Sequence, residues 1–368
     1  MLRRFLNILR AYDWILFGSV LFLVTIGVLL QYGLSLGQEG ATLSFFWRQL
    51  VFAILGVLIV FIASVFDYRG LRTWTPWLYL GALGLLITVL IIGATLRGVK
   101  GWIPLFGFQF QVVELVKLLM VMVLAKYWIG KVYEVGRLKH IIASGILTAI
   151  PFTLILLQPD LGSGLIIFGL WLTIVLLTGI RLRYFLIMVL SGIIIAVGAW
   201  LFLFKDYQKQ RILTFVYPTH DPLGSGYQVR QSVIAVGSGR FFGRGLGLGT
   251  QSQLHFLPET RTDFAFAVIA EELGFVGVTL LLGLYVVFFW RLYVLARHGD
   301  DDFSIFLVVG FFIIFFLQAF VNIGMNLGIA PIVGLPLPFI SYGGSSLLCS
   351  LVAVGILESI AVRQRLEL

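Results

Sequence analysis

The chain of 368 residues has few charges and a single cysteine. Only 12% of its residues are charged and 60% are hydrophobic, whereas an ordinary soluble domain is about a quarter charged. Cys349 cannot form an intrachain disulfide, so a disulfide framework is excluded. A water-soluble globule could not bury this much apolar surface, and the solvent must be lipid. The sequence therefore predicts an integral membrane protein.

Long apolar runs follow one another along the chain, and no soluble domain is appended to them. Crossing a hydrocarbon layer takes about 20 apolar residues. Residues 1–12 are basic and partly amphipathic without a cleavage site, so a cytoplasmic segment should precede an uncleaved first span. The predicted fold is one all-α polytopic membrane domain over residues 1–368 with about ten transmembrane helices. The candidate spans are 14–34, 46–66, 74–96, 112–130, 141–158, 164–180, 184–204, 265–290, 303–329 and 338–362.

Basic residues in the short loops set the predicted orientation. If the N-terminus is inside, every cytoplasmic loop carries Lys or Arg, for example Arg72, Arg137, Arg181 and Arg297. An even number of spans then places both termini on the cytoplasmic side of the cytoplasmic (inner) membrane. The net charge of +9 is scattered between spans rather than gathered in one groove, so no nucleic-acid partner is expected.

Residues 205–262 lack any 20-residue apolar run and form the predicted long extracytoplasmic loop between spans seven and eight. A loop of this length is usually functional or disordered. Its basic residues, Arg211 and Arg261 among them, would bind either anionic lipid headgroups or an anionic substrate. Its glycine-rich stretch 237–249 lacks the dinucleotide-binding pattern because Leu248 stands where the third glycine is required. Tight turns near the membrane surface are the preferred interpretation of these glycines.

Two charged residues fall inside the fourth span. Glu114 and Lys117 are three positions apart and share a helix face. A charge near the bilayer centre costs about 2.5–3.5 kcal/mol on insertion scales, so such residues face a partner or a cavity. The pair is either a structural ion pair or part of a cavity open to the outside, in which Lys117 contacts a phosphate. Trp102, just before this span, is either an interface anchor or part of the same site.

Residues 256–264 close the long loop. If Thr262 caps the following helix, Asp263 lies in its first turn, where the helix dipole favours an ionised carboxylate. Such a carboxylate at a cavity can accept a proton or hold a divalent cation; alternatively it is simply a second capping acid. Glu259 precedes it by four residues, and Asp160 lies at the same predicted surface.

Polar and proline-rich segments mark the last two spans. Asn322 and Asn326 share one face of the ninth span, being four residues apart. Residues 331–338 contain three prolines and cannot form a continuous helix. Irregular backbone at membrane depth requires cover from protein or water. These segments therefore indicate a hollow at the outer side of the membrane.

Taken in order, these motifs resemble the SEDS family (shape, elongation, division and sporulation), and within it the RodA-like branch. The resemblance covers nearly the whole chain, and the motifs are long and specific. The blocks that carry it are 221–228, 249–253, 256–264, 271–274, 322–325 and 334–346.

The resemblance implies a peptidoglycan glycosyltransferase that uses lipid II, the undecaprenyl-diphosphate-linked precursor, and works with a class B penicillin-binding protein. The family's essential acid corresponds to Asp263. Its membrane-embedded lysine and acid correspond to Lys117 and Glu114, and its outer-loop tryptophan to Trp102. Arg261 stands where the family commonly has histidine, which puts in doubt any role assigned to that histidine but not the reaction.

The implied reaction converts an α-linked sugar diphosphate into a β-1,4 glycan, which requires inversion. Asp263 is the candidate base for the acceptor hydroxyl. Lys117, Arg211 and a divalent cation (Mg or Mn) are candidates for stabilising the departing diphosphate. Arg261, Glu259 and Asp160 complete the predicted site.

Two rival functions are a lipid II flippase and a scaffold that activates the penicillin-binding protein. A flippase should carry polar groups through the full membrane depth, whereas the charges here lie near the outer face, which favours an enzyme. The short N-terminal tail and residues 334–340 favour a role in cell elongation and rod shape over division.

Overall fold

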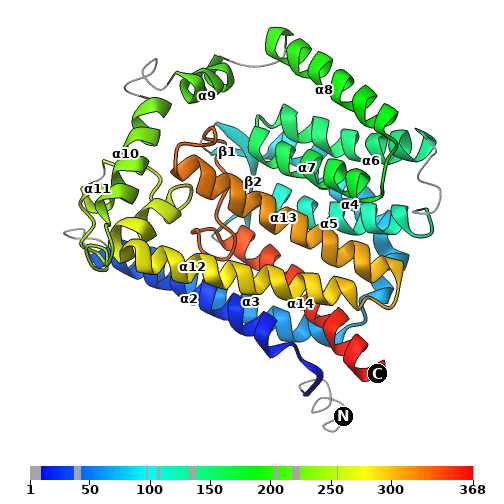
Figure 1. Cartoon of the computed structure of the whole chain (residues 1–368), viewed down its shortest axis with the longest axis horizontal. Coiled ribbons are helices and arrows are strands. Elements are labelled where there is room, and N and C mark those ends of the chain that lie inside the picture. Colours follow the sequence, from blue (N-terminus) through cyan, green and yellow to red (C-terminus); the bar gives the residue numbers. More distant parts are fainter. Residues whose placement is uncertain are drawn as a thin grey trace.

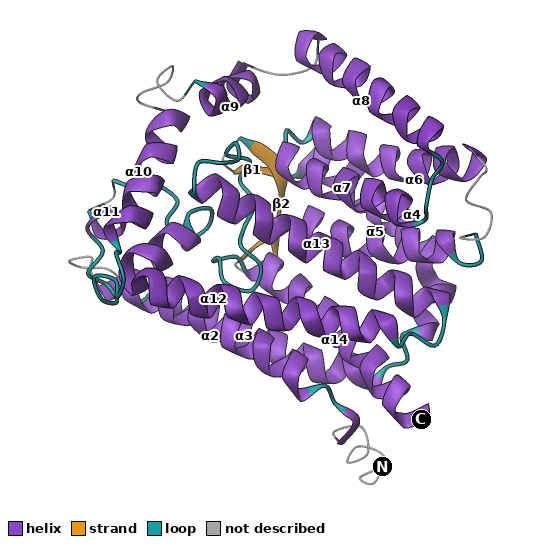
Figure 2. Cartoon of the chain, viewed as in Figure 1, coloured by secondary structure: helices purple, strands orange, loops and turns teal. Residues whose placement is uncertain are grey.

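The computed structural model describes residues 10–36, 43–96, 98–105, 108–131, 138–202, 206–217, 224–254 and 256–367. Helices make up most of this structure, and one small sheet lies beside them (Figures 1 and 2). The helices are α2 (Trp14–Leu36), α3 (Ser44–Val65), α4 (Arg69–Ile92), α5 (Val112–Trp128), α6 (Leu138–Leu157), α7 (Leu161–Leu177), α8 (Leu182–Phe202), α9 (Asp206–Val216), α10 (Ser225–Ser238), α11 (Thr250–Gln253), α12 (Ala265–Arg297), α13 (Asp302–Asn326) and α14 (Gly344–Glu367).

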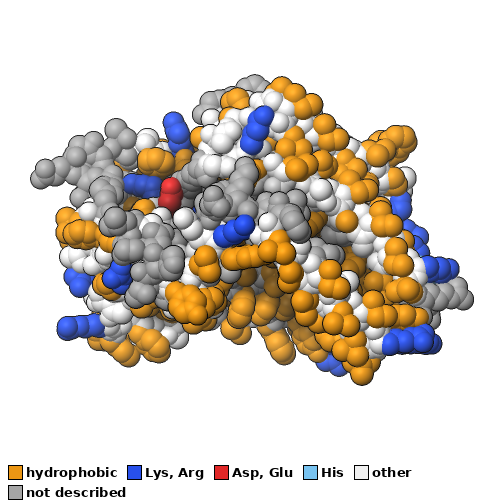
Figure 3. Space-filling view, turned by 90° about the horizontal axis from the view of Figure 1, so that it is seen from above, with side chains coloured by type: hydrophobic (Ala, Val, Ile, Leu, Met, Phe, Trp, Pro, Cys, Tyr) orange, Lys and Arg blue, Asp and Glu red, His pale blue; other side chains and the backbone are white. Residues whose placement is uncertain are grey.

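Each of the ten predicted spans overlaps one of these helices, and the predicted class of polytopic helical membrane protein is confirmed. Within the described residues, seven helices are long and apolar enough to cross a membrane: α2, α3, α4, α6, α12, α13 and α14. Helices α5 and α7 are also apolar, but they have only 17 residues each and are not counted among these seven. The total of ten spans stays a prediction. A space-filling view shows hydrophobic side chains over much of one face, with Lys and Arg scattered among them (Figure 3).

The sequence prediction missed a small antiparallel sheet between α4 and α5. Its strands are β1 (Ala94–Leu96), β2 (Val99–Leu105) and β3 (Phe108–Gln111), in the order β1-β2-β3. Trp102 on β2 is paired with Gln111 on β3, directly before α5 begins. The sheet therefore fixes where the outer-loop tryptophan lies relative to the start of α5.

Helix α5 is the central helix of the bundle, and nearly all of its residues are buried. It packs against α4, α7, α13 and α14, while α14 packs along α3, and α12 packs between α2 and α13. The charged pair of α5 is therefore enclosed by protein rather than by lipid. In contrast, none of the described side chains of α8 is buried, and Figure 1 shows this helix set apart from the bundle.

Helix α12 is broken inside the membrane domain, and the glycine-rich segment fills the break. Gly274 has φ 63° and ψ −160°, which interrupts the helical hydrogen-bond ladder. Gly243, at φ 79°, lies so close that an added Cβ would be 2.1 Å from the Glu272 carbonyl oxygen. Four backbone hydrogen bonds of 2.9–3.1 Å join the two segments, from the amides of Arg244, Gly245, Phe275 and Val276 to the carbonyls of Glu271, Glu272, Arg240 and Phe241. The glycines agree with the tight turns that the sequence indicated.

The predicted loop 205–262 contains three helices, α9, α10 and α11, within its described parts. Helices α10 and α11 lie at one end of the bundle, and both chain termini lie at the other end (Figure 1). Termini at a common end agree with an even number of crossings. The side of the membrane that each end faces stays a prediction, as does the cytoplasmic placement of residues 1–12, of which 1–9 lie outside the described residues.

Candidate functional site

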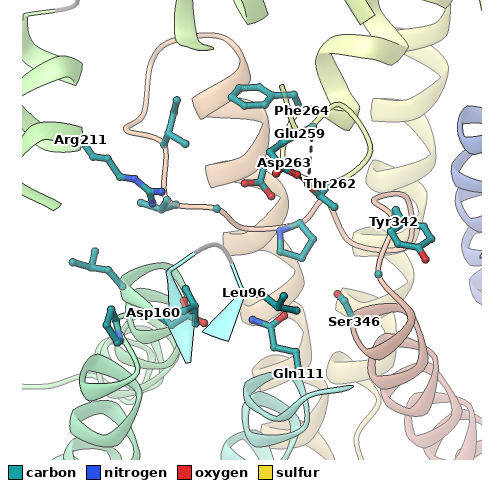
Figure 4. A pocket seen from close by; sticks show the side chains of 18 of the residues that line it. Leu96, Gln111, Asp160, Arg211, Glu259, Thr262, Asp263, Phe264, Tyr342 and Ser346 are labelled. Atoms are coloured by element: carbon teal, nitrogen blue, oxygen red, sulfur yellow. Dashed lines mark hydrogen bonds between the residues drawn. The ribbon is translucent and has the colours of Figure 1, made fainter. Parts of the chain in front are cut away.

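A cavity of about 490 Å³ opens among the sheet, α9, α10 and the irregular segment before α14. Five of the predicted site residues line it: Trp102, Asp160, Arg211, Glu259 and Asp263. Figure 4 shows Arg211 entering the cavity from the side opposite Tyr342 and Ser346. The structure thus brings one guanidinium and three carboxyl groups to a single hollow.

Asp263 is presented by a tight turn that begins at Glu259. The amides of Thr262 and Phe264 donate to the Glu259 carbonyl at 3.1 and 3.3 Å, and the Thr262 hydroxyl donates to the Glu259 carboxylate at 3.0 Å. Glu259 has φ 53°, an unusual conformation for a residue with a side chain. The carboxyl groups of Glu259 and Asp263 lie near each other on the cavity wall (Figure 4).

The expectation that Thr262 caps the eighth span was wrong. Helix α12 begins at Ala265, and Phe264 occupies its N-cap position without a side-chain hydrogen bond. The Thr262 hydroxyl is directed back to Glu259 instead, so it is not placed to cap the helix. Asp263 consequently lies in the turn before the helix rather than in its first turn.

Asp160 forms another part of the cavity wall, at the N-cap of α7. Its two carboxylate oxygens accept hydrogen bonds from the amide and the hydroxyl of Ser163 at 2.9 and 2.7 Å. Burial raises the pKa of Asp160, and the hydrogen bonds from Ser163 and the charge of Lys117 act against this rise. Asp160 is a capping acid that also faces the cavity.

Glu114 and Lys117 form a buried ion pair that does not line the cavity. Their side chains are 5% and 2% exposed, and Lys117 Nζ lies 2.8 Å from Glu114 Oε1. Of the two interpretations of this pair, the structure contains the ion pair, and neither Lys117 nor Glu114 is among the residues that line the cavity. The Lys117 charge reaches the site through its electrostatic interaction with Asp160.

Arg261 also lies outside the lining of the cavity. Its guanidinium donates to the side chain of Gln31 and to the carbonyl of Leu34 on α2, each at 3.2 Å. It stacks over the Phe45 ring at 4.5 Å. The side chain is therefore directed toward the first two spans and joins them to the turn that carries Asp263.

Several polar residues of the lining were not predicted. Gln111, Gln228, Tyr342 and Ser346 come from β3, α10, the segment before α14 and the first turn of α14. They are scattered over more than half of the sequence, and no spacing among them marks a site. Only the position of the last three within the blocks 221–228 and 334–346 could have indicated them.

The donor set of the cavity limits how a metal could bind. Among the described residues, no group of three or more His, Cys, Asp or Glu side chains is placed to hold a metal ion. Mg²⁺ commonly uses one or two carboxylates together with substrate phosphates and water. Asp263 and Glu259 could supply such carboxylates, so the site fits a cation that arrives with a diphosphate and does not fit an all-protein metal cage.

Comparison with known proteins decides the family. A family model described as "Cell cycle protein" and named for FtsW, RodA and SpoVE matches residues 13–366. The chain belongs to this family. It is the SEDS family that the motifs resemble, and its named members here include FtsW, RodA and SpoVE. The family match covers both the cavity and the bundle around it.

Named relatives of the SEDS family share most of the length of the chain. Stage V sporulation protein E of Bacillus subtilis is 38% identical over 95% of this chain and 96% of its own length. Peptidoglycan glycosyltransferase MrdB of Escherichia coli is 36% identical over 89% of this chain and 88% of its own. A solved structure described as "Structural coordination of polymerization and crosslinking by a peptidoglycan synthase complex" matches with a TM-score of 0.78 and 32% identity, covering 96% of this chain and 98% of that one. The chain is thus an integral membrane protein of the SEDS fold.

Proposed function

We propose that the chain is a peptidoglycan glycosyltransferase that polymerises lipid II into β-1,4 glycan strands at the outer face of the cytoplasmic membrane. The observation that carries this proposal is the placement of the Asp263 carboxyl group in a cavity of about 490 Å³, with Arg211 on another wall. Relatives of the same length are named peptidoglycan glycosyltransferases, which supports the reaction class.

Asp263 removes the proton from the 4-hydroxyl of the acceptor sugar as that oxygen attacks the anomeric carbon of the donor. The diphosphate leaves from the opposite face, so the configuration inverts. Arg211 binds the departing diphosphate, because a guanidinium forms paired, charge-assisted hydrogen bonds with phosphate oxygens. A divalent cation held by Glu259 and the diphosphate would neutralise further charge there.

The buried position of Lys117 changes its part in this mechanism. Because Lys117 is buried in an ion pair with Glu114 and does not line the cavity, Arg211 rather than Lys117 contacts the diphosphate. The charges of Lys117 and Glu114 act on the pKa of Asp160 in opposite directions, and burial outweighs both. Trp102 and the apolar residues Leu96 and Leu165 of the lining contact the sugar rings and the first isoprene units of the lipid.

The orientation and the partner follow from the same proposal. The end that holds the cavity faces outward, and the end with both termini faces the cytoplasm, as the basic loops predict. The proposed partner is a class B penicillin-binding protein, in keeping with a structural relative in a complex for polymerisation and crosslinking. We assign the chain to elongation and rod-shape maintenance on the residues 334–340.

A flippase fits the structure less well than an enzyme does. Below Lys117, the buried residues of α5 are apolar from Leu118 to Ala125, so the central helix offers no polar path toward the other end. A scaffold without catalysis would not need a carboxyl group held at a cavity. Polymerisation therefore accounts for the site better than either alternative.

A three-part assay separates these functions. Purified chain is incubated with fluorescent lipid II, alone and with its class B partner, and the products are resolved by gel; parallel liposomes report movement of lipid II between leaflets. We expect glycan strands without translocation. Translocation of lipid II without glycan strands would establish a flippase. Absence of both glycan and translocation, together with faster crosslinking by the class B partner, would establish a scaffold. Asp67→Asn, which removes an exposed carboxylate paired with Arg363 far from the cavity, should polymerise normally and serves as the control.

A further inference from the structure

Two asparagines converge on the backbone of Asp263. Asn322 and Asn326 are fully buried, lie four residues apart and share one face of α13. The Nδ2 groups of both donate to the main-chain carbonyl oxygen of Asp263, each at 3.0 Å. One oxygen thus receives two side-chain donors from a helix that lies about 60 residues further along the chain.

The same amide groups join this carbonyl to the elements around the cavity. Asn322 also donates to the Leu335 carbonyl at 2.7 Å, which lies in the irregular segment that lines the cavity. Asn326 donates to the Asn322 carbonyl at 2.7 Å, and its side-chain oxygen accepts from the Ala267 amide at 3.0 Å in the first turn of α12. The pair therefore fixes the relative positions of α13, the irregular segment and the start of α12.

The two preceding carbonyls are anchored as well. The Tyr342 amide donates to the Arg261 carbonyl at 2.7 Å, and the Ser341 hydroxyl donates to the Thr262 carbonyl at 2.5 Å. Three consecutive carbonyls, from 261 to 263, thus accept hydrogen bonds from α13 and from the segment before α14. These contacts hold the backbone from which the Asp263 carboxyl group extends.

We propose that Asn322 and Asn326 are positioning residues that hold the Asp263 carboxyl group at the acceptor hydroxyl. The inference rests on the proposed role of Asp263 as the base. A proton transfer requires heavy atoms within about 2.6–3.2 Å of each other, and a misplacement of about 1 Å can cost about 100-fold in rate. Two donors on one carbonyl restrict its position more tightly than one donor does, and this restriction acts directly on the residue that carries the base.

If the two asparagines had a purely structural role, their substitution would lower kcat only as far as it lowers stability. Ser232 provides the control for this alternative. Its hydroxyl is fully buried and donates to the Asn326 carbonyl at 2.9 Å, so Ser232→Ala removes a hydrogen bond to the same residue without touching Asp263. The test variants are Asn322→Ser combined with Asn326→Ser, and Asn326→Asp alone. The aspartate is isosteric and keeps the acceptor for the Ala267 amide. Even when protonated it has one O–H donor for the Asp263 and Asn322 carbonyls, to which the asparagine donates from two N–H bonds.

The experiment measures kcat, the KM for lipid II and Tm for each purified full-length variant with its class B partner. We expect the double variant to lose about 100-fold in kcat with KM changed less than about threefold, and Asn326→Asp to lose about 10-fold. Ser232→Ala should lower Tm and leave kcat near the wild-type value. The proposal is overturned if the asparagine variants keep normal kcat, or if Ser232→Ala lowers kcat as much at a similar loss of Tm.

Asp263→Asn, assayed in parallel, separates this inference from the proposed function. If Asp263→Asn is inactive while the asparagine variants turn over normally, positioning by Asn322 and Asn326 is refuted and the role of Asp263 stands. If Asp263→Asn itself polymerises lipid II, the role of the base is refuted, and the positioning role with it. Should the double variant fail to fold, Asn326→Asp provides the decision, because it preserves side-chain volume and one of the original hydrogen bonds.

Discussion

The break in α12 makes a quantitative prediction about glycine substitutions. Gly243 has φ 79°, a region that costs a residue with a side chain about 1–2 kcal/mol. A Cβ there would lie 2.1 Å from the Glu272 carbonyl oxygen, so the segment must move away from α12. That movement breaks the hydrogen bonds of the Arg244 and Gly245 amides with α12, each worth about 1 kcal/mol net. Gly243→Ala should therefore lower the free energy of unfolding by about 3 kcal/mol.

Gly237 provides a matched control in the same glycine-rich stretch. It lies within α10, and an added Cβ at this position would meet no heavy atom within 4 Å. Gly237→Ala should leave stability unchanged or raise it by up to about 1 kcal/mol, because alanine favours a helix. Both variants are compared with wild type by chemical denaturation in detergent micelles. Equal stability of the two variants would refute the role of residues 240–245 in closing the break.

Further predictions concern the charged groups around the cavity. Arg211→Gln should raise the KM for lipid II by about 10-fold or more, because a charge-assisted hydrogen bond is worth about 1.5–3 kcal/mol, and polymerisation kinetics measure this. Lys117→Met should destabilise the protein by about 3–5 kcal/mol by leaving Glu114 buried without its partner, and Glu114→Gln in addition should restore most of the loss, as thermal unfolding would show. Since burial raises the pKa of Asp160 in the folded state, its contribution to stability should decrease as pH rises through that pKa; Asp160→Asn should flatten this part of the profile of Tm against pH.

The sequence was sufficient to place the ten long apolar helices and to single out five residues that line the cavity. Every backbone polar group in lipid must be satisfied within its own helix, so apolar runs identify the helical segments directly. Trp102, Asp160, Arg211, Glu259 and Asp263 were expected near one surface, and all five line one cavity.

Features that depend on contacts between distant segments were missed. The run 265–290 is predicted as one span, with Glu271 and Glu272 near its start, and only the backbone of 240–245 shows where α12 breaks. The burial of Lys117 depends on α13 and α14, which follow it by almost 200 residues and more. The Thr262 hydroxyl had two acceptable partners, a helix amide and the Glu259 carboxylate, and the tight turn selects the second. Local spacing does not contain this information.

The most direct test of the account compares binding with turnover in Asp263→Asn. The substitution keeps the size of the side chain and removes its basicity, so the cavity and Arg211 are retained. A general base contributes about 100- to 10,000-fold to a rate. The account predicts lipid II affinity within about threefold of wild type and a loss of at least about 100-fold in the rate of glycan formation. Glycan formation at a rate near that of wild type, with unchanged lipid II affinity, would contradict it.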